Sequence, residues 1–87
     1  MKTNPLTVIP GVGKRIAADL NGIGIYRTED LKRKDPESLY AEMNKKQGVI
    51  IDRCMLYVLR CAVYFASNTT HAPELLKWWK WKDRQNP

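Results

Sequence analysis

LTVIPGVGKRIAADL, at residues 6–20, predicts two short helices joined by a tight turn. Pro10 fixes its own φ angle where the first helix ends. Gly11 and Gly13 can adopt positive φ and leave no Cβ beside the backbone. Val12 lies between these two glycines, and we expect its side chain to anchor the turn in the core. The second helix then begins directly after the turn.

The turn is predicted to bind an anion. The first amides of a helix lack intrahelical partners and carry partial positive charge. We therefore expect Gly11, Val12 and Gly13 to offer backbone N–H groups to a phosphate. Lys14 and Arg15 follow, and each can add a charge-assisted hydrogen bond to the same phosphate. Contacts of this kind hold a nucleic-acid backbone without reading its sequence, and they weaken as salt rises.

Residues 6–20 resemble the helix-hairpin-helix motif, in which a hydrophobic turn precedes Pro-Gly-hydrophobic-Gly and a second helix. The continuation, Gly-Ile-Gly-Ile at residues 22–25 and Thr-Glu-Asp-Leu at residues 28–31, is similar to that of helix-hairpin-helix domains and competence regulators. A second hairpin is not evident, because Gln-Gly-Val-Ile at residues 47–50 keeps one glycine. The resemblance implies weak binding by a single hairpin. In the alternative, the Pro-Gly-Val-Gly turn is only structural.

Helix breakers divide the rest of the chain into short segments. Asn4-Pro5 and Asp35-Pro36 are typical of an N-cap followed by proline in the first turn. The predicted helices are a short one after Asn4, then residues 14–21, a short one capped by Thr28, and residues 36–47, 51–66 and 73–82. No alternating strand pattern occurs. We therefore predict one all-α domain over residues 1–87, a compact bundle of about five to six short helices. The hairpin resemblance implies that this bundle has a SAM-like, helix-hairpin-helix fold.

The longest predicted helix, residues 51–66, has two faces. An apolar stripe is predicted to face the core, and it consists of Ile51, Cys54, Val58, Cys61 and Phe65. A second stripe is predicted to be half-exposed, and it consists of Arg53, Tyr57, Arg60 and Tyr64. We expect this helix at the centre of the bundle.

Basic residues are concentrated near the two ends of the chain. The net charge is +6, from 15 Lys or Arg and 9 Asp or Glu, and the pI is about 9.6. A pI above about 9 is compatible with a polyanionic partner. Lys32, Arg33 and Lys34 form a basic run after a short helix, and they are predicted to extend the phosphate contacts of the turn. In the alternative reading, this run is a solvated helix end.

The last predicted helix, residues 73–82, is rich in tryptophan. Trp78, Trp79 and Trp81 alternate with lysines, a pattern that can stack on unpaired bases. Tryptophan is mostly buried in proteins, so we favour packing. In that interpretation Trp79 closes the core, while Trp78 and Trp81 cover its edge.

No constellation of residues predicts catalysis, a cofactor or a metal. Cys54 and Cys61 are about 10 Å apart on one helix, too far for a disulfide between them. Together with His71 they match no zinc spacing, so we expect buried, unligated thiols. No nucleophile–base pair, P-loop or dinucleotide fingerprint occurs, and we expect a protein that is not an enzyme. We also expect a cytoplasmic protein, because neither a signal peptide nor a membrane-spanning stretch is evident.

Segments beyond the hairpin are similar to one family in particular. Residues 48–54, 57–64 and 73–83 resemble the bacterial pathogenicity-locus family, whose members are often labelled mitomycin-resistance proteins. The similarity covers nearly the whole chain. It implies a helix-hairpin-helix domain with a link to DNA, and through the family label to DNA damage or mitomycin resistance.

The leading prediction is sequence-independent binding of the DNA phosphate backbone through the hairpin. The alternative is a module for protein–protein interaction or self-association, in which the hairpin is only structural. An exposed patch at Trp78 and Trp81 would favour that alternative. A third hypothesis, an enzyme acting on a drug or nucleotide, rests on the family label alone.

Overall fold

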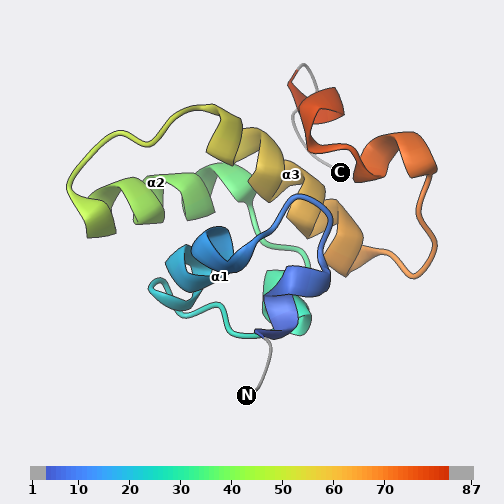
Figure 1. The fold of residues 1–87 in the computed structure, drawn as a ribbon, viewed down its shortest axis with the longest axis horizontal. Helices are drawn as coiled ribbons and strands as arrows, with labels where there is room; N and C mark the ends of the chain where they lie inside the picture. Colours follow the sequence, from blue (N-terminus) through green and yellow to red (C-terminus); the bar gives the residue numbers. More distant parts are fainter. Residues whose placement is uncertain (1–3, 83–87) are drawn as a thin grey trace.

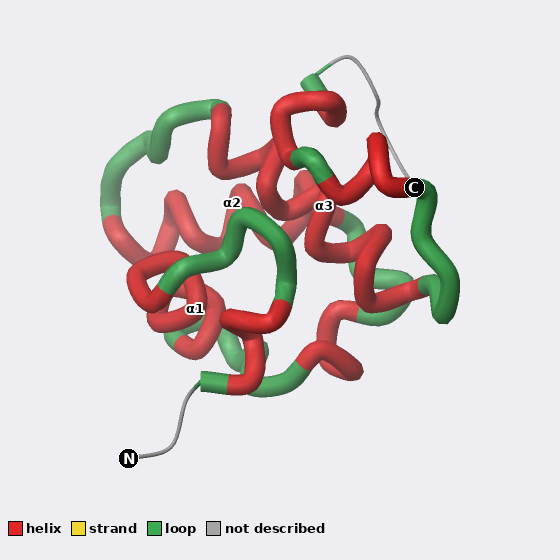
Figure 2. Tube along the Cα trace, turned by 45° about the vertical axis from the view of Figure 1, so that its right-hand side comes forward, coloured by secondary structure: helices red, strands yellow, loops and turns green. Residues whose placement is uncertain are grey.

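The computed structural model describes residues 4–82, and within that range all regular structure is helical (Figures 1 and 2). The elements are η1 (Pro5–Val8), α1 (Lys14–Asn21), η2 (Thr28–Leu31), α2 (Pro36–Gln47), α3 (Cys54–Ser67), η3 (Pro73–Leu76) and η4 (Trp78–Trp81). The all-α prediction is confirmed for these residues. None of the described helices is long and apolar enough to cross a membrane.

The predicted number of helices is wrong. Only three α-helices form in residues 4–82, and the other four elements are 3-10 helices of four residues each. An isolated α-helix of one turn fixes several dihedral angles for a single hydrogen bond, which makes it unfavourable. Segments of this length close instead with i to i+3 bonds, as in a 3-10 turn.

Helix ends agree with the prediction where a local signal is strong. The Asn4 side chain accepts from the Leu6 amide and begins η1. The Asp35 side chain accepts from the Glu37 amide and begins α2. Gly48 ends α2 in the left-handed conformation, with φ +69°. Thr28 does not act as a cap, since it is the first residue of η2 and the cap position falls on the residue before it.

Helix α3 lies at the centre of the fold, between α2 and the C-terminal segment, residues 73–82 (Figure 1). Its buried residues are Leu56, Val58, Leu59, Arg60, Cys61, Ala62, Val63 and Ala66. Five of them, Val58, Leu59, Ala62, Val63 and Ala66, pack in one core with Leu6, Leu20 and Met43, which are fully buried. A helix that is covered on most sides belongs in the interior, and the predicted central position is confirmed.

For two residues of α3 the predicted degree of burial is wrong. Cys54 is exposed, although the apolar stripe predicted a core position. Arg60 is buried, with 3% of its surface exposed, although it belongs to the stripe predicted to be half-exposed. Cys54 is the first residue of α3, at the edge of the core, and Arg60 is covered by the C-terminal segment.

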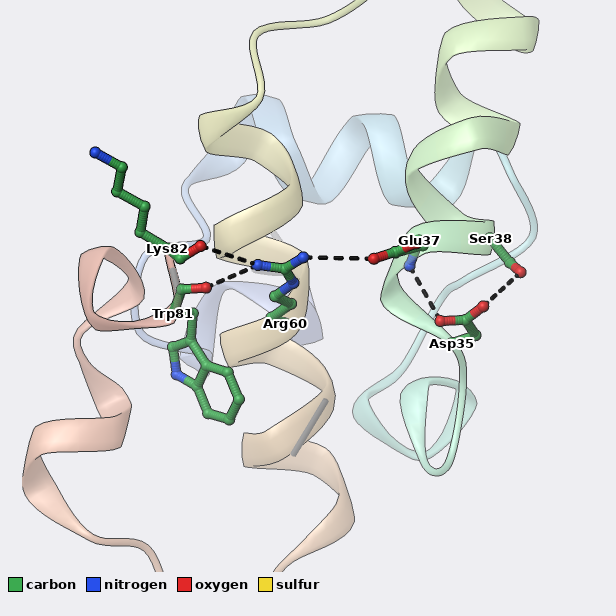
Figure 3. A network of polar contacts seen from close by, with 6 residues as sticks. All are labelled: Asp35, Glu37, Ser38, Arg60, Trp81 and Lys82. Carbon is green, nitrogen blue, oxygen red and sulfur yellow. Dashed lines mark hydrogen bonds and ion pairs between the residues drawn. The ribbon is translucent and has the colours of Figure 1, made fainter. Parts of the chain in front are cut away.

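Arg60 links three elements of the fold (Figure 3). Its Nη1 donates to the main-chain carbonyls of Trp81, at 2.9 Å, and Lys82, at 3.4 Å. Its Nη2 lies 3.4 Å from the Glu37 carboxylate on α2. The buried guanidinium therefore fastens the end of the C-terminal segment to α3 and α2.

The C-terminal segment differs from the single helix predicted over residues 73–82. It consists of η3 and η4, separated at Lys77. Trp81 is 1% exposed and its Nε1 donates to the Leu75 carbonyl, whereas Trp79 is 55% exposed. The predicted roles of these two tryptophans are therefore reversed. A 3-10 helix has three residues per turn, which places Trp78 and Trp81 on one face and Trp79 away from it.

Candidate nucleic-acid interface

The η1–α1 turn, residues 9–13, joins the two N-terminal helices. Val12 is 5% exposed, and its amide donates to the Ile9 carbonyl at 3.0 Å. The predicted anchoring role of Val12 is confirmed, but its amide points into the turn and is not free to bind a ligand. Gly11 has φ +86°, the left-handed region that favours glycine. Gly13 has φ −91° and caps α1 in an extended conformation, so the expected positive φ occurs only at Gly11.

Of the five consecutive amides from Gly11 to Arg15, only that of Val12 has a partner within residues 4–82. Within residues 4–82, the N–H groups of Gly11, Gly13, Lys14 and Arg15 donate to no protein atom. All four residues are exposed. The first turn of α1 contains no acidic residue, so no carboxylate neutralises the positive end of this helix. This short segment therefore exposes four backbone donors and two cationic side chains.

A pair of asparagines holds the two helices that flank the turn. Asn4 Nδ2 donates to Asn21 Oδ1 at 2.8 Å, and Asn21 Nδ2 donates to the Ile25 carbonyl at 2.8 Å. The first bond ties the start of η1 to the end of α1. Sequence reasoning identified Asn4 only as a cap, because two asparagines that are 17 residues apart form no local pattern.

The basic run Lys32, Arg33 and Lys34 lies elsewhere on the molecule. All three residues are exposed, Arg33 has φ +58°, and its amide donates to Ser67 Oγ at 3.1 Å. Ser67 is the last residue of α3. The η1–α1 turn instead shares a shallow cavity with residues of the first half of α3. The described contacts therefore do not bring the basic run and the turn together.

The C-terminal segment borders the turn on one side. A Cβ atom added to Gly11 would lie 3.0 Å from Cδ1 of Trp78, so the indole rests directly against this glycine. Trp78 is half-buried, while Gly11 keeps an exposed surface. The contact fixes one edge of the turn and leaves the amide side of α1 accessible.

Within residues 4–82, no three side chains of His, Cys, Asp or Glu gather at one place in a way that could hold a metal ion. The ionisable residues at the turn are both cations, Lys14 and Arg15. What the site can do chemically is therefore to bind an anion through N–H donors and positive charge.

Comparisons with known proteins support one family. A family model described as "Pathogenicity locus" matches residues 1–86. The mitomycin resistance protein McrB of Streptomyces lavendulae is 32% identical over 74 residues, which are 85% of this chain and 67% of that protein. A DNA polymerase IV of Enterobacter sp. (strain 638) is 40% identical over 53 residues, which are 61% of this chain and 15% of the polymerase. No solved structure shows significant similarity to the chain.

Proposed function

The chain belongs to the pathogenicity-locus family, and on that premise we propose that it is a non-catalytic domain that binds the DNA phosphate backbone through the η1–α1 turn. In this proposal residues 6–20 form a helix-hairpin-helix motif whose first helix is the single turn η1. The observation that carries the proposal is the set of exposed, unpartnered amides at Gly11, Gly13, Lys14 and Arg15.

The chemistry of the turn suits a phosphate better than a neutral ligand. Backbone N–H groups at a helix N-terminus and cationic side chains both stabilise a negative charge. Neither group reads a base, so the binding is independent of sequence. One turn neutralises about two phosphates at most, and the logarithm of affinity should fall with the logarithm of salt with a slope of about −2.

The names of two relatives are consistent with a role at DNA. One is a mitomycin resistance protein, and another is a DNA polymerase, of which this chain matches a small part. Because the match covers 15% of the polymerase, we do not assign the activity or the substrate of that enzyme to this chain. What we extend to this chain is backbone binding, with a link to DNA damage or mitomycin resistance.

A protein-interaction module is the second candidate function, and one observation favours it. Val49 and Ile50, in the loop between α2 and α3, are 57% and 89% exposed. Adjacent exposed apolar side chains often mark a contact surface. The patch at Trp78 and Trp81 that would have supported this reading is absent, because Trp81 is buried.

Fluorescence anisotropy with labelled duplex and single-stranded DNA tests the proposal. The variant Lys14→Glu/Arg15→Glu reverses both charges at the turn. The matched control, Lys45→Glu/Lys46→Glu, makes the same charge change at two exposed lysines in the last turn of α2. We expect the wild type and the control to bind, and the turn variant to lose binding while circular dichroism shows that it remains folded.

Two results would overturn the proposal. One is a failure of the wild type to bind either DNA at low salt. The other is an equal loss of affinity in both double variants, because that result would reflect net charge alone. Either result would leave the protein-interaction function as the better explanation.

A further inference from the structure

A second surface lies beside the η1–α1 turn. It is a shallow groove between the start of α3 and the C-terminal segment, and we call it the tryptophan groove. Its lining residues include Arg53, Cys54, Tyr57, Trp78, Trp79 and Lys82. Aromatic rings and cations therefore face the same space, within a domain whose other exposed apolar residues are mostly aliphatic.

The aromatic rings of this groove contact one another or neighbouring residues. The rings of Trp78 and Trp79 are perpendicular, with an interplanar angle of 88° and centroids 5.8 Å apart. Trp78 is fixed by its contact with Gly11. The Tyr57 ring has the buried guanidinium of Arg60 on one face, 5.7 Å from its centroid. Trp79 is 55% exposed, and its indole is available to a planar ligand.

The groove is continuous with the η1–α1 turn through Trp78. This residue lines the tryptophan groove, and it also lines the shallow cavity that includes Gly11 and Ile16. A strand held by a phosphate at the turn would therefore place a neighbouring nucleotide next to the Trp78 and Trp79 rings.

The charges in the groove also suit a nucleotide. Arg53 and Lys82 are exposed cations, and Asp52 is the single carboxylate among the lining residues. One oxygen of Asp52 accepts a hydrogen bond from the Cys54 amide at 2.9 Å, so part of its charge is already satisfied. The surface combines a small positive excess with aromatic faces, which is the combination that binds unpaired nucleotides.

We propose that the tryptophan groove binds an unpaired nucleobase, by stacking on Trp79, when the η1–α1 turn holds a phosphate of the same strand. This inference rests on the proposed function, because the turn supplies the backbone contact. A base within a duplex has both faces covered by its neighbours, so the groove should favour single-stranded or flipped nucleotides over paired ones.

A comparison of two strands with equal numbers of phosphates tests the inference. One is an oligothymidylate, and the other is an abasic strand of the same length that lacks every base. We expect the wild type to bind the oligothymidylate between about 5-fold and 150-fold more tightly, the range expected for stacking of one base. Trp79→Ala should abolish this preference and leave the affinity for the abasic strand unchanged. The matched control is Tyr26→Ala, which removes another exposed ring, 59% accessible, and should retain the preference.

A second measurement on the wild type does not depend on the folding of a variant. Cys54 is exposed and lines the groove. Alkylation of Cys54 by iodoacetamide should be slowed by the oligothymidylate and unaffected by a saturating amount of the abasic strand. Equal protection by both strands would overturn the inference.

The two proposals fail in different ways. Equal affinity of the wild type for both strands would overturn base binding and leave the phosphate contact intact. An equal loss of affinity for both strands in Trp79→Ala would also overturn base binding, since the ring would then contact the sugar-phosphate backbone that the two strands share. Absence of binding to either strand would overturn the proposed function itself.

Discussion

The guanidinium of Arg60 donates a 2.9 Å hydrogen bond to the main-chain carbonyl of Trp81. This carbonyl ends η4, where the last acceptors of a helix lack partners within the helix. A side chain from the central helix thus caps the C-terminal segment, and it does so from a buried position. This contact between distant parts of the chain helps to hold the segment that carries Trp78 and Trp79, and with it the tryptophan groove.

We predict that Arg60→Met lowers the free energy of unfolding by about 2–3 kcal/mol, because a charge-assisted hydrogen bond from a buried guanidinium is lost. The ion pair with Glu37 adds little, since Glu37 is largely exposed. Urea unfolding followed by circular dichroism measures the change. Arg27→Met is the control: the Arg27 guanidinium makes an exposed ion pair with Glu29, and its loss should cost less than about 0.5 kcal/mol. Equal losses in the two variants would contradict the capping role.

Substitution of glycine by alanine at three positions should separate backbone strain from the Trp78 contact. Gly24→Ala introduces strain alone, because φ is +88° and the space around it is open, and we expect a loss of about 1 kcal/mol. Gly11→Ala adds a clash with Trp78 and should lose about 1 kcal/mol more. Gly13→Ala has φ −91° and no neighbour within 4 Å, so its loss reflects only the poorer N-cap that alanine makes and should stay below about 1 kcal/mol.

The same urea titrations measure these three variants. In the double variant Gly11→Ala/Trp78→Ala, the additional loss at Gly11 should disappear, since the clashing atoms are gone. If Gly11→Ala and Gly24→Ala were equally destabilised, the Trp78 indole would not be pressed against the turn. The argument that joins the turn to the tryptophan groove would then lose its basis.

Local signals in the sequence are sufficient to predict the turns and most of the helix ends. Gly11 and Gly48 adopt the left-handed conformation, and Asn4 and Asp35 act as caps, because each depends on residues within four positions along the chain. The apolar stripe of α3 was sufficient to predict its central position.

Contacts between distant segments could not be predicted from these signals. The burial of Arg60 and the exposure of Trp79 both follow from the docking of the C-terminal segment on α3, which no local pattern encodes. The sequence pattern predicted one helix over residues 73–82. The structure has two 3-10 helices separated at Lys77, and Trp81 rather than Trp79 therefore faces the core. The separation of the basic run from the η1–α1 turn is likewise a consequence of tertiary structure.

We predict that Asn21→Ala destabilises the fold by about 1–2 kcal/mol and weakens DNA binding. Asn21 accepts from Asn4 and donates to the Ile25 carbonyl, so its loss leaves two partly buried groups unpaired. It also releases η1 from α1, which should broaden the positions of the amides at the turn. Asn68→Ala is the control, because the Asn68 amide makes a single exposed bond to the Tyr64 carbonyl. Unchanged stability in Asn21→Ala would show that the Asn4–Asn21 bond does not hold η1 against α1.

The two thiols should differ in reactivity, and the difference should depend on Asp52. Burial raises the pKa of the Cys61 thiol to about 11, so we expect iodoacetamide to modify Cys61 only after unfolding. Cys54 is exposed and should react in the folded protein. A hydrogen bond to the Asp52 carboxylate raises the pKa of the Cys54 thiol above its ordinary value of 9.0. Because the thiolate is the nucleophile, Cys54 should react more slowly near pH 8 than a free thiol does.

Asp52→Asn should accelerate the alkylation of Cys54 and move the pH profile of the rate to lower pH. The substitution removes the negative charge that opposes the thiolate, while the amide oxygen of an asparagine can still accept from the Cys54 amide. Asp30→Asn provides the control, since Asp30 receives its hydrogen bonds from the Tyr26 and Arg27 amides in another part of the fold. Mass spectrometry of timed reactions identifies which cysteine is modified. A profile that Asp52→Asn leaves unmoved would mean that this carboxylate does not control the reactivity of Cys54.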